Sequence, residues 1–110
     1  MTGVLLVLTT IPADQATTLA RQVVEERLAA CAQIQAAADS IYWWQGAVQT
    51  DREATIVLKT SDTVIEPLIT RIKALHPYEL PEILVFEAIG GLHAYLDWVH
   101  SQTFFEACNP

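Results

Sequence analysis

The stretch that decides the fold is Val4-Leu5-Leu6-Val7-Leu8, which continues as Thr9-Thr10-Ile11-Pro12. An unbroken run of valine and leucine of this length is typical of a buried β-strand, and a proline ends such a strand. A strand with one wet face would alternate apolar and polar residues, and this run does not alternate. We therefore predict a strand at residues 4–8 whose two faces are both apolar.

The residues that follow supply the rest of the fold. Apolar spacing, glycines and prolines predict a helix at Ala13–Ala29, a hairpin of strands at 31–46 and 53–60, a helix from Val64 to before Pro77, a strand at 83–86, a short helix at 92–99 and a tail at 103–110. This order indicates an α+β, ferredoxin-like βαββαβ sandwich with an added C-terminal helix. We expect one domain over residues 1–110, because domains typically have about 100 to 150 residues.

The second unbroken apolar strand, Ile83-Leu84-Val85-Phe86, repeats the pattern of the first. In a ferredoxin-like fold both crossover helices cover the same face of the sheet, so the other face should be polar. Here it is apolar as well. We therefore expect that the helix-free face is buried in an oligomer.

The charge of the chain excludes some partners. Thirteen acidic and six basic residues give a net charge of −7, which repels phosphate backbones and anionic membrane surfaces. We therefore expect no nucleic-acid partner and no membrane partner. We also expect a cytoplasmic location, because no apolar stretch approaches the roughly 20 residues that span a bilayer and none resembles a secretory signal. Cys31 and Cys108 should remain thiols, with Cys31 a buried structural residue.

The loop His76-Pro77-Tyr78-Glu79-Leu80-Pro81-Glu82 is the most specific local feature. Its two prolines hold an imidazole, a phenol and two carboxylates on a stiff segment. The simpler interpretation is a rigid connector with a surface histidine. His93, Asp97 and His100 share one face of the last helix at a spacing that suits weak cation binding, although a solvated helix face is the favoured interpretation.

Aromatic residues form a further group: Tyr42, Trp43, Trp44, Tyr95 and Trp98. They either line a ligand cleft or anchor an interface, and an interface is favoured for the tryptophan pair. The chain contains no GxGxxG, P-loop, GxSxG, HExxH or paired CxxC motif. We therefore expect a binding protein and not an enzyme.

Five segments, taken in order and at matching spacing, resemble the CutA family of divalent-cation tolerance proteins: residues 25–32, 40–46, 59–60, 76–82 and 95–98. The resemblance runs from about Val4 to Thr103. It implies a ferredoxin-like subunit in a tight homotrimer similar to the PII signalling proteins, located in the cytoplasm and connected with tolerance of copper and other divalent ions.

The resemblance also implies where a metal would bind. Family metal sites are proposed at a cysteine after the first strand and at a His-His pair before Pro-Tyr. This chain has Thr9 at the first place and Leu75-His76 at the second, so only His76 carries over. We expect weak binding of a divalent metal such as copper by His76, with Glu79 and Glu82 as oxygen donors, and no obligatory cofactor.

An alternative function has a different site. A PII-like signalling or scaffold trimer would hold a small molecule or a protein segment in the clefts between its subunits. The residues expected to line such a cleft are Tyr42, Trp44, Lys59, Tyr78 and Trp98.

Overall fold

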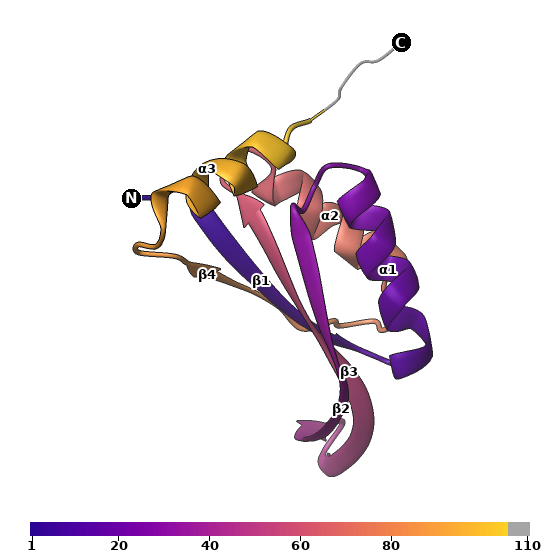
Figure 1. The fold of residues 1–110 in the computed structure, drawn as a ribbon. Coiled ribbons are helices and arrows are strands. Elements are labelled where there is room, and N and C mark those ends of the chain that lie inside the picture. Colours follow the sequence, from indigo (N-terminus) through magenta and orange to yellow (C-terminus); the bar gives the residue numbers. More distant parts are fainter. Residues whose placement is uncertain (106–110) are drawn as a thin grey trace.

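The valine- and leucine-rich run lies at the centre of a four-stranded antiparallel sheet (Figure 1). The structure, a computed structural model, describes residues 1–105. In chain order its elements are β1 (Val4–Ile11), α1 (Ala13–Glu25), β2 (Cys31–Trp44), β3 (Ala47–Ser61), α2 (Ile65–Leu75), β4 (Ile83–Glu87) and α3 (His93–Gln102). The strand order across the sheet is β2-β3-β1-β4. These elements confirm the predicted α+β, ferredoxin-like fold with its added C-terminal helix.

Helices α1 and α2 pack on one face of the sheet, as expected for the two crossover helices (Figure 1). Pairing sets Val7 opposite Leu58 and Ile11 opposite Ala54, and all four side chains are buried beneath these helices. The helices complete this core with Ala16, Leu19, Ala20, Val23, Leu68 and Ile72. The apolar residues of the helices recur every three or four positions, so each helix buries one stripe.

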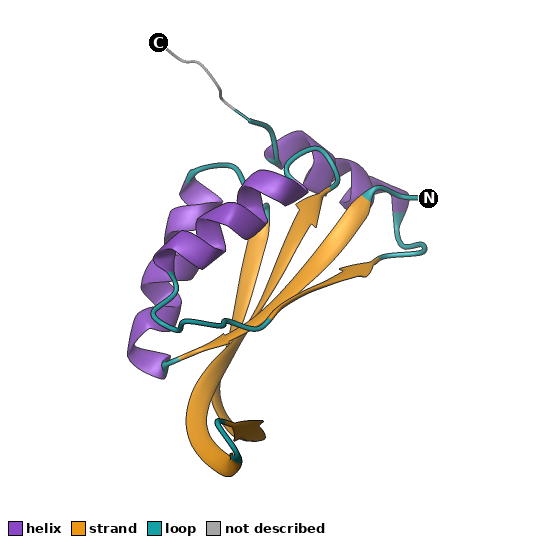
Figure 2. Cartoon of the chain, turned by 180° about the vertical axis from the view of Figure 1, so that it is seen from behind, coloured by secondary structure: helices purple, strands orange, loops and turns teal. Residues whose placement is uncertain are grey.

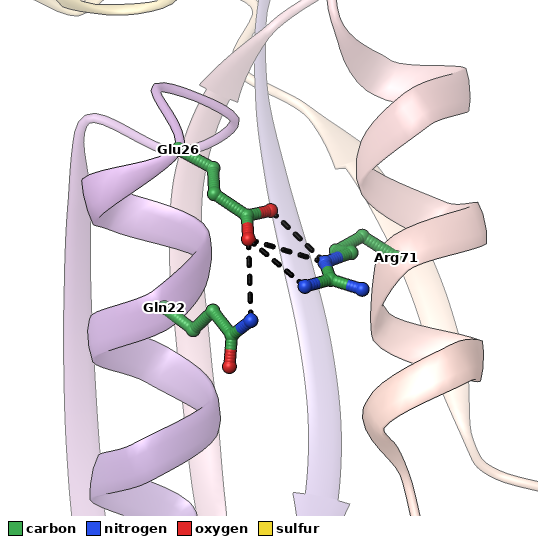
Figure 3. A network of polar contacts seen from close by, with 3 residues as sticks. All are labelled: Gln22, Glu26 and Arg71. Carbon is green, nitrogen blue, oxygen red and sulfur yellow. Dashed lines mark hydrogen bonds and ion pairs between the residues drawn. The ribbon is translucent and has the colours of Figure 1, made fainter.

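A polar contact also joins the two helices on the outer surface (Figure 3). Arg71 donates from Nε and from one terminal nitrogen to the carboxylate of Glu26, each at 3.0 Å, and Gln22 donates to the same carboxylate at 3.2 Å. Arg71 and Glu26 therefore form a two-pronged ion pair between α2 and the residue that follows α1. A bidentate pair of this kind adds geometric specificity to the contact between the helices.

The opposite face of the sheet has an apolar centre that no helix covers. Leu6 lies opposite Phe86, and Leu8 lies opposite Leu84 and Val57 on its two sides. Leu84 and Phe86 are 48% and 50% exposed in the single chain. The prediction of a second apolar face is therefore correct at the centre of the sheet.

Helix α3 covers one end of this second face. Val99 is fully buried there, and the hydroxyl of Thr103, just after α3, lies 2.7 Å from that of Ser61 on β3. None of the helices in residues 1–105 combines the length and the apolar character needed to cross a bilayer.

Strands β2 and β3 extend beyond the helices as a long hairpin arm that curls back on itself (Figures 1 and 2). The register of the two strands shifts between Gln35 and Ala38, where the arm leaves the body of the sheet. Its tip is the two-residue turn Gln45-Gly46, in which both residues have positive φ, as the tight turns of hairpins require. Apolar side chains on the arm, those of Ile41, Trp43 and Val48, are largely exposed.

Several boundaries differ from the sequence predictions. The first helix ends at Glu25 and not at Ala29, because Arg27 adopts a positive φ of 67° and the chain turns into the core at Leu28. Strand β3 begins at Ala47, well before the predicted residue 53. Cys31 is only half-buried, so its expected burial is wrong for the single chain, and Cys108 lies outside the described residues.

Candidate functional site

A cavity of about 700 Å³ lies between the hairpin arm and the loop that joins α2 to β4. The arm contributes strand residues to one wall, and the loop contributes the segment between Tyr78 and Glu82 to the other. The residues that line it are Thr10, Ser40, Ile41, Tyr42, Trp44, Asp51, Glu53, Tyr78, Glu79, Leu80, Pro81 and Glu82. A volume of this size suits a small organic molecule, for which pockets of about 300 to 1,000 Å³ are usual.

His76 fixes the start of the loop. It is buried, and its Nε2 lies 2.7 Å from the carbonyl oxygen of Thr10, while its Nδ1 accepts a hydrogen bond of 3.2 Å from the backbone N–H of Tyr78. Because Nδ1 accepts, Nε2 carries the proton and donates to Thr10. The alternative of a surface histidine is wrong. The imidazole instead ties the loop to the end of β1.

Tyr78 connects the loop to the arm. Its ring packs against that of His76 with centroids 4.8 Å apart, and its hydroxyl donates to Oε2 of Glu53 at 2.6 Å. Glu53 is only 4% exposed. Burial, reinforced by the hydrogen bond to Glu53, raises the pKa of the Tyr78 hydroxyl well above its ordinary value. The phenol therefore remains a neutral donor to this carboxylate.

A second phenol–carboxylate pair lies farther along the arm. The Tyr42 hydroxyl donates to Asp51, and this bond, as the largest cause, raises the pKa of Tyr42. Ser40 pairs with Asp51 across the two strands, and Trp44 completes the aromatic side of the cavity.

The cavity is strongly acidic. Four of its lining residues are carboxylates, namely Asp51, Glu53, Glu79 and Glu82, and no lysine, arginine or histidine is among the described residues that line it. None of the three ion pairs within residues 1–105 includes a carboxylate of the cavity. The site therefore presents uncompensated negative charge to whatever enters it.

The residues predicted as metal ligands are placed unequally. Glu79 and Glu82 line the cavity, and Glu82 accepts a hydrogen bond of 3.2 Å from the Thr10 hydroxyl. Both ring nitrogens of His76 are already hydrogen-bonded, so it can coordinate an ion only by breaking one of these bonds. No group of three or more His, Cys, Asp or Glu side chains in residues 1–105 is arranged to hold a metal ion. These residues do not fit a tight metal site.

The other sequence features implied in metal binding lie apart from the cavity. Thr9, at the place where the resemblance implied a cysteine, is fully buried among core residues. His100 lies with Nε2 2.8 Å from the carbonyl oxygen of Thr2, while His93 and Asp97 are exposed on α3.

The predicted cleft residues separate into two sets. Tyr42, Trp44 and Tyr78 line the cavity together. Lys59 lies on β3 within the body of the sheet, where its ammonium group donates to Gln33 at 2.6 Å. Trp98 lies on α3 against Tyr95, with ring centroids 5.6 Å apart. Within one chain, the structure therefore does not bring Lys59 and Trp98 to the cavity.

Sequence reasoning missed Asp51 and Glu53. Two carboxylates at alternate positions of a strand point to the same face, and this spacing was the available indication. It did not stand out because the predicted strand began at residue 53. Extending the hairpin to its Gln45-Gly46 turn would have placed both residues on a strand that faces the loop.

The chain was compared with known protein families and solved structures. Residues 5–102 match the family described as CutA1 divalent ion tolerance protein. The divalent-cation tolerance protein CutA of Thermus thermophilus is 45% identical over 98 residues, which cover 88% of this chain and 95% of that protein. The chloroplastic protein CutA 1 of rice is 37% identical over 100 residues, covering 90% of this chain and 56% of that protein.

A solved structure shows the same fold. The PII-like protein CutA from Nostoc sp. PCC 7120, in apo form, superposes with a TM-score of 0.88 at 39% identity, over 92% of this chain and 98% of that chain. The family match over residues 5–102 spans every described residue that lines the cavity.

Proposed function

This chain belongs to the CutA1 divalent ion tolerance family, and we propose that it acts by binding and not by catalysis, as a cytoplasmic homotrimer that holds divalent cations such as copper weakly. The observation that carries the proposal is the cavity with four carboxylates and no basic lining residue. No histidine, cysteine or lysine is among its described lining residues. The cavity therefore offers no imidazole base, thiolate or amine nucleophile, and its serine has no neighbouring histidine or lysine in the lining to activate it.

Weak binding follows from the donors that the cavity offers. Carboxylate oxygens suit hard divalent ions, whereas tight copper or zinc sites require imidazole or thiolate ligands in addition. Glu79 and Glu82 are exposed and lie on the loop, so they are the groups that an entering ion meets first. His76 supports them by holding the loop in place.

Copper titration by calorimetry at moderate salt tests this assignment. We expect an affinity weaker than micromolar, a further loss of about threefold or more in the double variant Glu79→Gln/Glu82→Gln, and a change of less than about twofold in Glu66→Gln, a control on the exposed surface of α2. The double variant is the deciding one, because His76→Gln would also release the loop that carries these two carboxylates. Submicromolar affinity that the double variant leaves unchanged would refute binding by these carboxylates.

The homotrimer is supported by the apolar centre of the uncovered sheet face. Leu6, Leu8, Val57, Leu84 and Phe86 form a contiguous patch that a single chain leaves partly in water. Monomeric proteins rarely expose apolar patches larger than a few hundred Å². Light scattering at micromolar concentration should give three times the mass of one chain, and the mass of a single chain would refute the assembly.

The second candidate function is that of a PII-like scaffold or signalling trimer that binds a small molecule or a protein segment in its clefts. The size of the cavity and its aromatic residues Tyr42, Trp44 and Tyr78 favour it. A metabolite screen read by thermal stability, with pull-down for protein partners, supports this function if saturable ligands appear in the absence of metal.

A further inference from the structure

The cavity between the arm and the loop contains a buried carboxylate that the described part of the chain only half satisfies. Glu53 is 4% exposed, and its single hydrogen bond among residues 1–105 runs from the Tyr78 hydroxyl to Oε2. Oε1 has no hydrogen-bond donor among these residues. Oε1 is not among the fully buried atoms of residues 1–105 that lack a partner, so it is open to the cavity and can accept a hydrogen bond from a donor that enters it.

The surrounding charges have the same sign. Asp51 lies two residues away on the same strand, and Glu79 and Glu82 face it from the loop. The nearest ion pair on the arm, between Arg52 and Asp39, is largely exposed and includes no lining residue of the cavity. A positively charged ligand therefore gains attraction from several groups and meets no competing cation from the lining.

The rest of the lining distinguishes an organic cation from a metal ion. Tyr42, Trp44 and Tyr78 provide aromatic rings, and Ile41, Leu80 and Pro81 provide apolar surface. Aromatic faces attract ammonium and guanidinium groups, and apolar walls bury the carbon skeleton attached to them. A bare ion would leave most of a cavity of about 700 Å³ unfilled.

We propose that this cavity binds a small organic cation, a primary ammonium or guanidinium group on an apolar body, with the charged group at Glu53 and Asp51 and the body against Tyr42, Trp44 and Leu80. The inference rests on the proposal that the cavity is a binding site, and it names the class of ligand. It does not depend on metal binding by the same protein.

The test uses the intact protein with a chelator present, so that its result is independent of copper. Phenethylamine, its neutral analogue phenethyl alcohol and the anion phenylpropionate are titrated by calorimetry, and tryptophan fluorescence reports binding because Trp44 lines the cavity. We expect saturable binding of the amine, with both analogues at least about tenfold weaker, because a charged hydrogen bond is worth about 1.5 to 3 kcal/mol.

Glu53→Gln removes the charge and retains an oxygen that accepts from Tyr78. We expect it to weaken amine binding by about tenfold or more, while Glu66→Gln, an equal change of charge on the exposed surface of α2, leaves the affinity within about twofold. If circular dichroism shows that Glu53→Gln does not fold, Asp51→Asn is held to the same expectation. Equal affinity for the alcohol, unchanged affinity in the charge-removing variant, or no saturable amine binding would overturn the proposal.

If the amine fails to bind while copper binds through the loop carboxylates, the organic-cation inference fails and the proposed metal binding stands. If the amine binds while copper does not bind through the loop carboxylates, the proposed metal binding fails and the organic-cation inference stands.

Discussion

Introducing a charge at Phe86 tests whether the uncovered sheet face is an interface between copies of the chain. Phe86 lies in β4, pairs with Leu6 and is 50% exposed in the single chain. A phenylalanine buries about 150 to 250 Å², so assembly can remove roughly 100 Å² more from water for each subunit. At about 25 cal/mol/Å² this amounts to about 2.5 kcal/mol per subunit, or about sixtyfold in an association constant.

Phe86→Glu removes this contribution and places a carboxylate in the interface, where desolvation costs several kcal/mol more. Light scattering of the variant at micromolar concentration should therefore give the mass of one chain. Far-UV circular dichroism should remain native, because half of the side chain is in water before assembly. The control is Thr17→Glu, which adds the same charge on the exposed surface of α1, one of the two helices that cover the other face of the sheet. A Phe86→Glu protein that keeps the mass of the wild type would refute the assignment of this face.

Three further predictions concern stability and titration. Glu26→Gln should lower the free energy of unfolding by about 0.5 to 1 kcal/mol at neutral pH. Because Arg71 lowers the pKa of Glu26, this contribution is present above pH 4.5 and is lost as pH falls through the folded pKa. Urea unfolding should therefore not distinguish the variant from the wild type in strong acid. Burial and the hydrogen bond to Glu53 raise the pKa of Tyr78, so tyrosinate absorbance should rise at higher pH in the native protein than in urea. The free energy of unfolding should correspondingly fall as pH rises above 10. Tyr78→Phe should reduce the difference in pH between the native and the unfolded titration. Thr9→Val should raise the free energy of unfolding, measured by thermal denaturation, by about 1 kcal/mol, since Thr9 Oγ1 is buried without a hydrogen-bond partner among residues 1–105. A loss of stability would instead show that the hydroxyl makes a favourable hydrogen bond.

The elements of the fold were predictable from sequence because burial determines local pattern. The unbroken apolar runs at β1 and β4 and the three-to-four-residue spacing of α1 and α2 depend only on which faces are covered. The end of α1 was not predictable in this way. Leu28 continues the helical spacing and is buried, yet it reaches the core from a turn in which its N–H donates to the carbonyl oxygen of Val23. Periodicity cannot distinguish these two routes to the same contact.

The aromatic residues and the loop carboxylates of the cavity were predictable, and its strand carboxylates, Asp51 and Glu53, were not. Tyr42, Trp44 and Tyr78 belong to conspicuous motifs, whereas Glu53 resembles any charged residue near the end of a strand. Its burial goes with a contact between distant segments, since its carboxylate accepts from the Tyr78 hydroxyl on the loop that begins at His76. Such contacts between distant segments leave no periodic trace in the sequence.

The strand order has a consequence for how this protein forms during synthesis. The ribosome makes β1 before the other strands, but β1 lies between β3 and β4 in the sheet. The edge of β1 that pairs with β4, for example Leu5 with Glu87, therefore remains unpaired until β4 has been made. Until then the growing chain exposes an apolar strand edge, the kind of edge that pairs with other chains. The central position of its most hydrophobic segment therefore makes closure of the sheet depend on late, long-range pairing, which slows folding, and loss of β4 would leave the apolar edge of β1 open to other chains.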